Sequence, residues 1–279
     1  TKSNGTANGQ WLTHPAFTFG TDELEGIWVG KFSTTGDATT PTIKPNLGML
    51  TDQNVSTQFT TSQKFGTTTY LTSTGVSEVD AHMMKNTEWG AVAYLKQSKY
   101  GLGTTDIGLN NYNSSPYLTG CGAASGSSSS TTCNAYNTTG GMLASTTGNI
   151  YGVYDMAGGA YEYVMGVLKT QDGTALYYHN STFTASTLPL GSKYVDAYTY
   201  GTSNSDYTRK ILGDATGETY GWYSDRAYFV CHTTGNNGAW FVRGDAFADG
   251  TYAGIFSFRS YFGSSDSKYA FRSVLAPGA

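Results

Sequence analysis

The sequence predicts an α+β protein with small antiparallel sheets, two main helices and long loops. Its 279 residues include 36 Gly, 22 Tyr and 13 Phe, and only 13% of them are charged. This composition is typical of a loop-rich protein with many aromatic side chains, not of a helical bundle. The clearest helical pattern precedes most strand patterns, without the strand–helix alternation of a parallel sheet. We expect one domain over residues 1–279.

The first half of the chain contains one strand pattern and one clear helix pattern. Apolar alternation over 26–32 predicts a strand, and the Thr-, Gly- and Pro-rich stretch 33–45 predicts a long loop. Residues 54–64 are at most weakly helical. Residues 78–97 place apolar side chains near helical spacing, with Ser77 as a cap, which predicts the clearest helix.

A polar segment follows the predicted helix. Residues 101–148 are almost wholly Gly, Ser, Thr, Asn and Tyr, which predicts a long ordered excursion without regular structure. Cys121 and Cys133 flank a Ser- and Gly-rich run. A disulfide between them would close this loop in an oxidising compartment, and two free thiols are the alternative.

The rest of the chain carries a second apolar segment, 150–168, and then short strands. We expect these strands at 228–230, 239–242, 254–258 and 271–275, because apolar runs alternate there with Gly, Asn and Asp turns.

Charge and composition argue against several function classes. The formal net charge is −4 and no Lys/Arg run occurs, so we expect no nucleic-acid partner. No apolar stretch is long enough to span a bilayer, and residues 1–10 lack an apolar signal core, so an export or anchoring segment is expected outside this sequence. The histidines and cysteines lack zinc-ligand spacing, so we expect no metal site and no cofactor, with structural calcium left open.

Three motifs carry a resemblance to a known family. Residues 86–93 read Asn-Thr-Glu-Trp-Gly-Ala-Val-Ala, and residues 149–164 read Asn-Ile-Tyr-Gly-Val-Tyr-Asp-Met-Ala-Gly-Gly-Ala-Tyr-Glu-Tyr-Val. Residues 240–245 and 271–275 read Trp-Phe-Val-Arg-Gly-Asp and Phe-Arg-Ser-Val-Leu. In this order they resemble the formylglycine-generating-enzyme (sulfatase-modifying-factor) branch of the C-type-lectin fold, which implies a C-type-lectin-like fold here.

The same resemblance implies where the family's chemistry would lie. Its oxidase activity uses a reactive cysteine pair in the C-terminal part, with bound copper. Residues 243–275 contain no cysteine, and Cys231 has no near partner in the sequence. We therefore expect no catalytic residues and no enzyme activity, although an oxidase of that family is kept as an alternative.

The C-terminal segment resembles a second group of proteins. Residues 250–272 read Gly-Thr-Tyr-Ala-Gly-Ile-Phe-Ser-Phe-Arg-Ser-Tyr-Phe-Gly-Ser-Ser-Asp-Ser-Lys-Tyr-Ala-Phe-Arg. This run resembles the variable proteins of diversity-generating retroelements, in which a related lectin-like domain ends in a mutagenised ligand-binding segment. The resemblance implies a variable segment at about 240–272.

We expect a solvent-facing ligand-binding patch made of the residues that the scaffold motifs leave unspecified. Aromatic anchors mixed with small polar groups are typical of adaptable binding surfaces. The alternative is that these aromatic side chains only pack loops. The predicted patch comprises Ala246, Phe247, Ala248, Asp249, Tyr252, Arg259, Ser260, Tyr261, Phe262, Ser265, Asp266, Lys268 and Tyr269.

Other motifs are expected to be structural. Arg243-Gly244-Asp245 spells an adhesion tripeptide but occupies a scaffold position in the family pattern. Arg272 and Glu162 are expected to be a structural cation and a buried, hydrogen-bonded acid. Cys231 and His232 would point to opposite faces of a strand, so a catalytic dyad is not expected.

These observations predict a ligand-binding or adhesion protein, secreted or displayed on a cell surface or phage particle. The expected partner is an unknown protein or glycan on another cell or host surface. A phage tail receptor-binding protein of the same fold is the other alternative.

Overall fold

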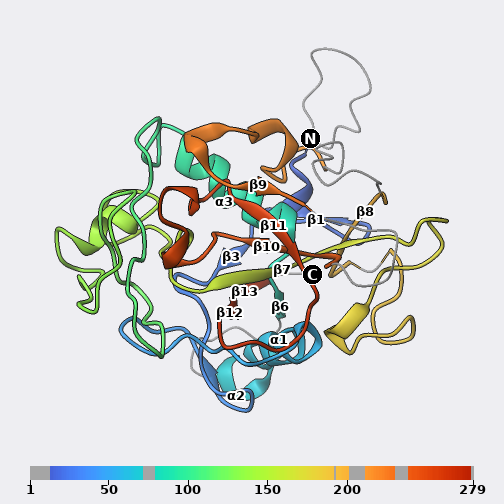
Figure 1. Cartoon of the computed structure of the whole chain (residues 1–279). Coiled ribbons are helices and arrows are strands. Elements are labelled where there is room, and N and C mark those ends of the chain that lie inside the picture. Colours follow the sequence, from blue (N-terminus) through green and yellow to red (C-terminus); the bar gives the residue numbers. More distant parts are fainter. Residues whose placement is uncertain (1–12, 72–78, 192, 201–210, 230–237, 278–279) are drawn as a thin grey trace.

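A mixed sheet of six strands lies at the centre of the computed structural model, which describes residues 13–71, 79–191, 193–200, 211–229 and 238–277 (Figure 1). Five strands follow the order β12-β7-β10-β11-β9, and β8 pairs with β7. Their bounds are Tyr161–Leu168 (β7), Asp196–Tyr198 (β8), Ala227–Tyr228 (β9), Trp240–Arg243 (β10), Phe258–Tyr261 (β11) and Tyr269–Phe271 (β12).

Smaller antiparallel sheets surround this centre. One joins β3 (Trp28–Val29) and β6 (Val79–Met83) to β13 (Ser273–Pro277), which ties the two ends of the described chain together. Two hairpins pair β1 (Thr18–Phe19) with β2 (Asp22–Glu23), and β4 (Thr35–Gly36) with β5 (Pro41–Thr42).

Two α-helices in the described ranges are longer than two turns. Helix α1 (Val55–Gln63) begins where the Asn54 side chain accepts a hydrogen bond from the Thr57 N–H at 3.0 Å. Helix α3 (Asn86–Gln97) begins where Glu88 accepts one from the Lys85 N–H at 2.7 Å. Helix α2 (Thr68–Leu71) is shorter. The 3₁₀ segments are η1 (Pro15–Phe17), η2 (Lys64–Gly66), η3 (Gly141–Ala144), η4 (His179–Ser181), η5 (Gly217–Thr219), η6 (Trp222–Ser224) and η7 (Phe247–Tyr252).

The α+β class with small sheets and few helices is confirmed, and the smaller sheets are antiparallel as expected, but the central sheet is mixed rather than antiparallel. The pairs β7–β8, β7–β12 and β9–β11 are parallel. Each parallel pair joins strands that are distant in the chain, so no short hairpin constrains its direction. Local strand patterns do not report such pairings.

Several predicted element bounds are corrected. The helix expected over 78–97 starts only at Asn86, because residues 79–83 pair with β13 as strand β6. The strand expected at 254–258 starts at Phe258, because Ser257 closes a turn onto the Gly254 carbonyl. The region 54–64 forms a clear helix, and the loop 33–45 contains a hairpin.

The excursion 101–148 is irregular apart from isolated bridges and η3, as expected, and lies to the left of the sheet in Figure 1, coloured green. A disulfide joins Cys121 to Cys133, with 5.0 Å between their Cα atoms. The structure therefore selects the bridged alternative over two free thiols.

The family-like motif residues form the buried frame beneath the mixed sheet. Arg272 is completely buried and donates to Glu162 through Nε (3.2 Å) and Nη2 (2.7 Å). Trp89 of α3 donates from its indole N–H to the Ile255 carbonyl at 2.7 Å. The expected structural roles of Arg272 and Glu162 are thus confirmed, and the frame fixes the strands that carry the candidate site.

Candidate ligand-binding face of the mixed sheet

Four tyrosines stack on one face of the mixed sheet. Tyr269 of β12 lies at the centre, with its ring centroid 5.0 Å from Tyr161, 4.8 Å from Tyr163 and 4.4 Å from Tyr261. The parallel register opposes Tyr269 to Tyr161, and side chains two residues apart on a strand share a face. We call these four residues the tyrosine cluster. Tyr163 and Tyr269 are buried, whereas Tyr161 and Tyr261 are half-buried, so the aromatic area that could meet a ligand is that of the two outer rings. The buried rings hold these outer rings in place, which lowers the entropic cost of a contact.

Strand β11 and the residue after it add a cation, Arg259, and a further aromatic ring, Phe262, beside the tyrosine cluster. Arg259, two residues before Tyr261, places its guanidinium 4.9 Å from the Tyr161 ring centroid. Phe262 packs against Tyr261 in an edge contact at 5.0 Å. Arg259, Tyr261 and Phe262 are only half-buried, so their outer sides face solvent. We call the tyrosine cluster together with Arg259 and Phe262 the tyrosine face.

An ion-pair network borders the tyrosine face. Arg226 contacts Asp245 through Nε at 2.8 Å and Asp249 through Nη2 at 2.5 Å. Asp249 also accepts a hydrogen bond from the Tyr161 hydroxyl at 2.8 Å, which joins the network to the tyrosine cluster. The Arg226 guanidinium lies 5.3 Å from the Tyr252 ring centroid. We call Arg226, Asp245 and Asp249 the carboxylate clasp.

Two carboxyl groups here have pKa values near neutrality. Burial raises the pKa of Asp245 to about 7, because it disfavours the charged form more than Arg226 favours it, and Asp249 raises it further. Burial likewise raises the pKa of Asp225 to about 7, against a hydrogen bond from the Phe256 N–H. The charge along this border therefore changes between pH 6 and pH 8, which is about one unit on either side of these values.

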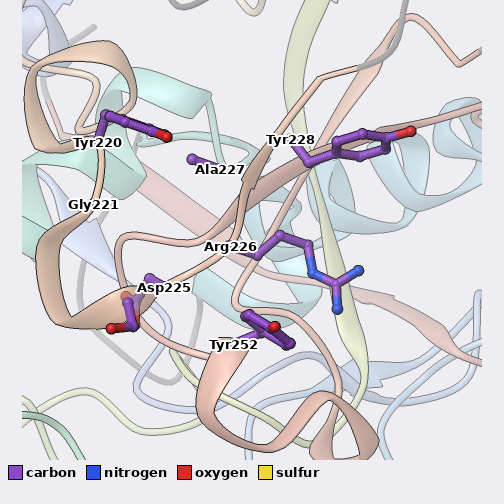
Figure 2. Close-up of a pocket in the computed structure, with 8 residues that line it drawn as sticks. Tyr220, Gly221, Asp225, Arg226, Ala227, Tyr228 and Tyr252 are labelled. Carbon is purple, nitrogen blue, oxygen red and sulfur yellow. The ribbon is translucent and has the colours of Figure 1, made fainter. Parts of the chain in front are cut away.

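A pocket of about 630 Å³ adjoins the clasp, between η6, β9 and η7 (Figure 2). Figure 2 shows Tyr220, Tyr228 and Tyr252 around it, with Arg226 between Tyr228 and Tyr252. The pocket residues are Tyr220, Gly221, Ser224, Asp225, Arg226, Ala227, Tyr228 and Tyr252.

The structure brings part of the predicted patch together. Asp249, Tyr252, Arg259, Tyr261 and Phe262 belong to the tyrosine face or touch the clasp. Ser260 is half-buried on β11.

The remaining predicted residues lie in the loops on either side. The half-buried Phe247 packs its ring 5.6 Å from Tyr117, and Ala248 beside it is exposed. Between β11 and β12, Ser265 and Lys268 are exposed and Asp266 is half-buried. The loop between β11 and β12 starts and ends on the tyrosine face, which places Ser265, Asp266 and Lys268 near the edge of the sheet.

Two predicted residues are not solvent-facing. Ala246 is only 5% exposed, because it caps η7 and its N–H donates to Asp249. Tyr269 is only 3% exposed, because three other tyrosines pack around it. Both residues support the surface from below and are removed from the set that a ligand could touch.

Sequence reasoning missed three residues of this region. Tyr161 and Tyr163 are two residues apart, which on a strand places both side chains on the same face. This pattern could have indicated a shared aromatic surface, but both residues also belong to the family-like motif. Arg226 gave no signal, because its acidic partners lie on a different segment of the chain and meet it only in the folded structure.

The other candidate motifs receive simpler explanations. Arg243 and Asp245 are fully buried, so the Arg-Gly-Asp tripeptide is not presented to solvent. Cys231 and His232 lie outside the described residues. Within the described ranges there is no group of three or more His, Cys, Asp or Glu side chains arranged to hold a metal ion. None of the helices in those ranges is long and apolar enough to cross a bilayer.

No protein-family model matches the chain, and no curated protein sequence matches it.

Proposed function

We propose that this protein binds a ligand through the tyrosine face, as a ligand-binding or adhesion protein on a C-type-lectin-like scaffold of the formylglycine-generating-enzyme branch. The observation that carries the proposal is that residues left unspecified by the scaffold motifs meet on one half-exposed face. Arg259 and Tyr261 project from β11 beside the stacked tyrosines, while the motif residues Arg272 and Trp89 lie buried.

The rigidity of the tyrosine face favours binding. Tyr269 is held on three sides by other rings, and Tyr161 is fixed by its hydrogen bond to Asp249. A surface that is already ordered loses little conformational entropy when a ligand docks. Aromatic and Arg side chains are also the residue types that most often dominate binding energy.

The cysteines support a binding role rather than an oxidase. The sequence holds three cysteines, and two of them form the Cys121–Cys133 disulfide. Cys231 then has no second thiol in this chain with which to form a reactive pair. A disulfide also agrees with a secreted or surface-displayed location, since such bonds persist mainly in oxidising compartments.

The resemblance to retroelement variable proteins makes diversification part of the proposal. Sequencing the DNA downstream of the gene tests it. We expect a near-copy of the last codons with adenines at the differing positions, together with a reverse transcriptase gene. Finding this cassette in a bacterial chromosome or in a phage genome would separate a cellular adhesin from a phage tail receptor-binding protein.

Binding itself is tested by panning the purified protein against arrays of extracellular proteins and glycans. We expect a specific partner whose binding weakens on Tyr261→Ala and Arg259→Ala, but not on Tyr151→Ala. Tyr151 is the matched control because its side chain is 85% exposed and belongs neither to the tyrosine face nor to the pocket lining. Equal weakening by all three changes would contradict the proposal.

A further inference from the structure

The pocket beside the carboxylate clasp has features that the tyrosine face lacks. Three tyrosines line it from separate segments, and Tyr220, Tyr228 and Tyr252 are 56%, 46% and 56% exposed. These are large aromatic side chains that border a hollow (Figure 2). Its volume of about 630 Å³ lies within the range of small-molecule sites.

The pocket lining holds one acidic and one basic side chain, Asp225 and Arg226, so neither sign of charge dominates it. Arg226 lines the pocket but is already paired with Asp245 and Asp249. An anionic ligand would have to compete with two carboxylates for this guanidinium. A cationic ligand would meet Arg226 itself, and burying like charges together is unfavourable. The pocket therefore suits a neutral ligand.

The polar groups of the pocket both donate and accept hydrogen bonds. The tyrosine and Ser224 hydroxyls can do either, Asp225 accepts, and Arg226 donates. A neutral ligand with many hydroxyl groups can use all of them, because each hydroxyl is also a donor and an acceptor. The aromatic rings need, in addition, an apolar ligand face to pack against.

Asp225 is held firmly in place for such a contact. Its carboxylate sits against Gly254, where an added Cβ would lie 2.0 Å from Oδ1, and Oδ2 accepts a hydrogen bond from the Phe256 N–H at 2.9 Å. Only glycine leaves room for the carboxylate at this position. The acceptor is thus preorganised at the pocket wall, which reduces the entropic cost of binding.

From this chemistry we infer that the pocket lined by Tyr220, Tyr228 and Tyr252 binds a neutral pyranose unit of a glycan. A pyranose ring combines a C–H face, which packs on tyrosine, with a rim of neutral hydroxyls for Ser224, Asp225 and Arg226. The inference rests on the proposed binding function and names its ligand class. Tyr252 contacts Arg226 of the clasp, which links the pocket to the tyrosine face.

The test uses the whole protein on an array that carries neutral, sialylated and sulfated glycans, with methyl hexopyranosides as soluble competitors. We expect binding to neutral glycans, competition by at least one methyl hexopyranoside, and a loss of about tenfold or more in affinity for Tyr228→Ala and Tyr220→Ala. Tyr151→Ala should bind as the unchanged protein does. Thermal unfolding of each variant shows that its fold is retained.

The outcomes separate this inference from the proposed function. Absence of glycan binding, preference for acidic glycans, or neutral-glycan binding that the pocket variants leave unchanged would each overturn the inference. If a protein partner is found whose binding is lost with Tyr261→Ala and kept with Tyr228→Ala, the tyrosine face stands as a binding surface and the saccharide pocket falls.

Discussion

Arg272 and Arg259 lie on opposite sides of the mixed sheet and differ in burial and in hydrogen bonding. Arg272 is fully buried, and its guanidinium donates to both Glu162 oxygens and to the carbonyls of Gly30 (2.7 Å) and Tyr154 (2.8 Å). Arg259 is half-buried on the Tyr161 ring, and its Nε has no hydrogen-bond partner among the described residues.

The difference separates what holds the fold from what can serve a ligand. A buried charge is tolerated only when partners satisfy it, so every polar contact of Arg272 is already used by the protein. Arg259 is half-buried, so part of its side chain faces solvent, while its planar group stacks on the Tyr161 ring. We therefore propose that the Arg272 side of the sheet serves stability, whereas the Arg259 side is available to bind a ligand.

The largest expected effect is on stability, on the Arg272 side. Arg272→Met would leave the Glu162 carboxylate buried without its partner, which should lower the free energy of unfolding by about 3–5 kcal/mol. Arg259→Met is the matched change on the other side and should cost about 1 kcal/mol or less, the contribution of a half-exposed cation–π contact. Chemical denaturation measures both, and similar losses would mean that the two sides do not differ as described.

The next effect is the pH dependence of stability that arises at the carboxylate clasp. The folded-state pKa of Asp245, about 7, lies above its ordinary value of 3.8, so the folded protein holds a proton there that the unfolded chain releases. Stability from this group is present at low pH and is lost as pH rises through about 7, by up to about 4 kcal/mol. Asp225 acts in the same direction.

Asp245→Asn isolates this contribution. Urea denaturation between pH 5 and pH 8 should show a decline in stability with rising pH that is steeper in the unchanged protein than in the variant. The histidines with lowered pKa values, His14 and His179, oppose the decline equally in both proteins and cancel in the comparison. Parallel pH profiles would show that Asp245 is not a neutral-pH group.

A smaller effect is expected from the centre of the tyrosine face. Tyr261→Ala should weaken ligand binding by about 1–3 kcal/mol if this ring is a binding hot spot. It should also cost about 0.5–1.5 kcal/mol of stability, since stacking on Tyr269 and the edge contact with Phe262 are lost. Calorimetric titration and thermal unfolding of one preparation give both values. A stability loss several times larger would identify Tyr261 as a core residue.

The smallest effect is expected at Tyr252, which is 56% exposed. Tyr252→Ala should change stability by less than about 0.5 kcal/mol, because this exposed ring contacts the Arg226 guanidinium and does not belong to the buried core. Phe271→Ala, in the buried β12, should instead cost about 3–5 kcal/mol through the cavity it leaves. Denaturation midpoints of the two variants provide the measurement.

The buried side of the sheet could be predicted better than the side that carries the tyrosine face. The motif resemblance correctly predicted structural roles for Glu162 and Arg272, because these two residues pair with each other in the buried interior. Arg226 could not be found in this way, since its two aspartates lie on a different segment of the chain and meet it only in the folded structure. Tyr269 looked like a surface residue, because no local pattern reveals that three other rings will cover it.

Strand β6 shows the same limit for the fold. Residues 79–83 have side chains spaced as in the helix that follows, yet they form a strand because β13, from the far end of the chain, supplies their hydrogen-bond partners. Local spacing predicted α3 correctly only from Asn86 onward. Elements that depend on distant partners were therefore the ones misassigned.

The most direct test of a ligand-binding tyrosine face is chemical footprinting of aromatic rings in the free and ligand-bound protein. Hydroxyl-radical labelling followed by mass spectrometry reports how accessible each ring is. On binding, we expect reduced labelling of Tyr261 and Phe262, whereas labelling of Tyr100 and Tyr151, which are 72% and 85% exposed, should not change. Reduced labelling of Tyr100 or Tyr151, with Tyr261 and Phe262 still fully reactive, would place the ligand elsewhere and contradict binding at the tyrosine face.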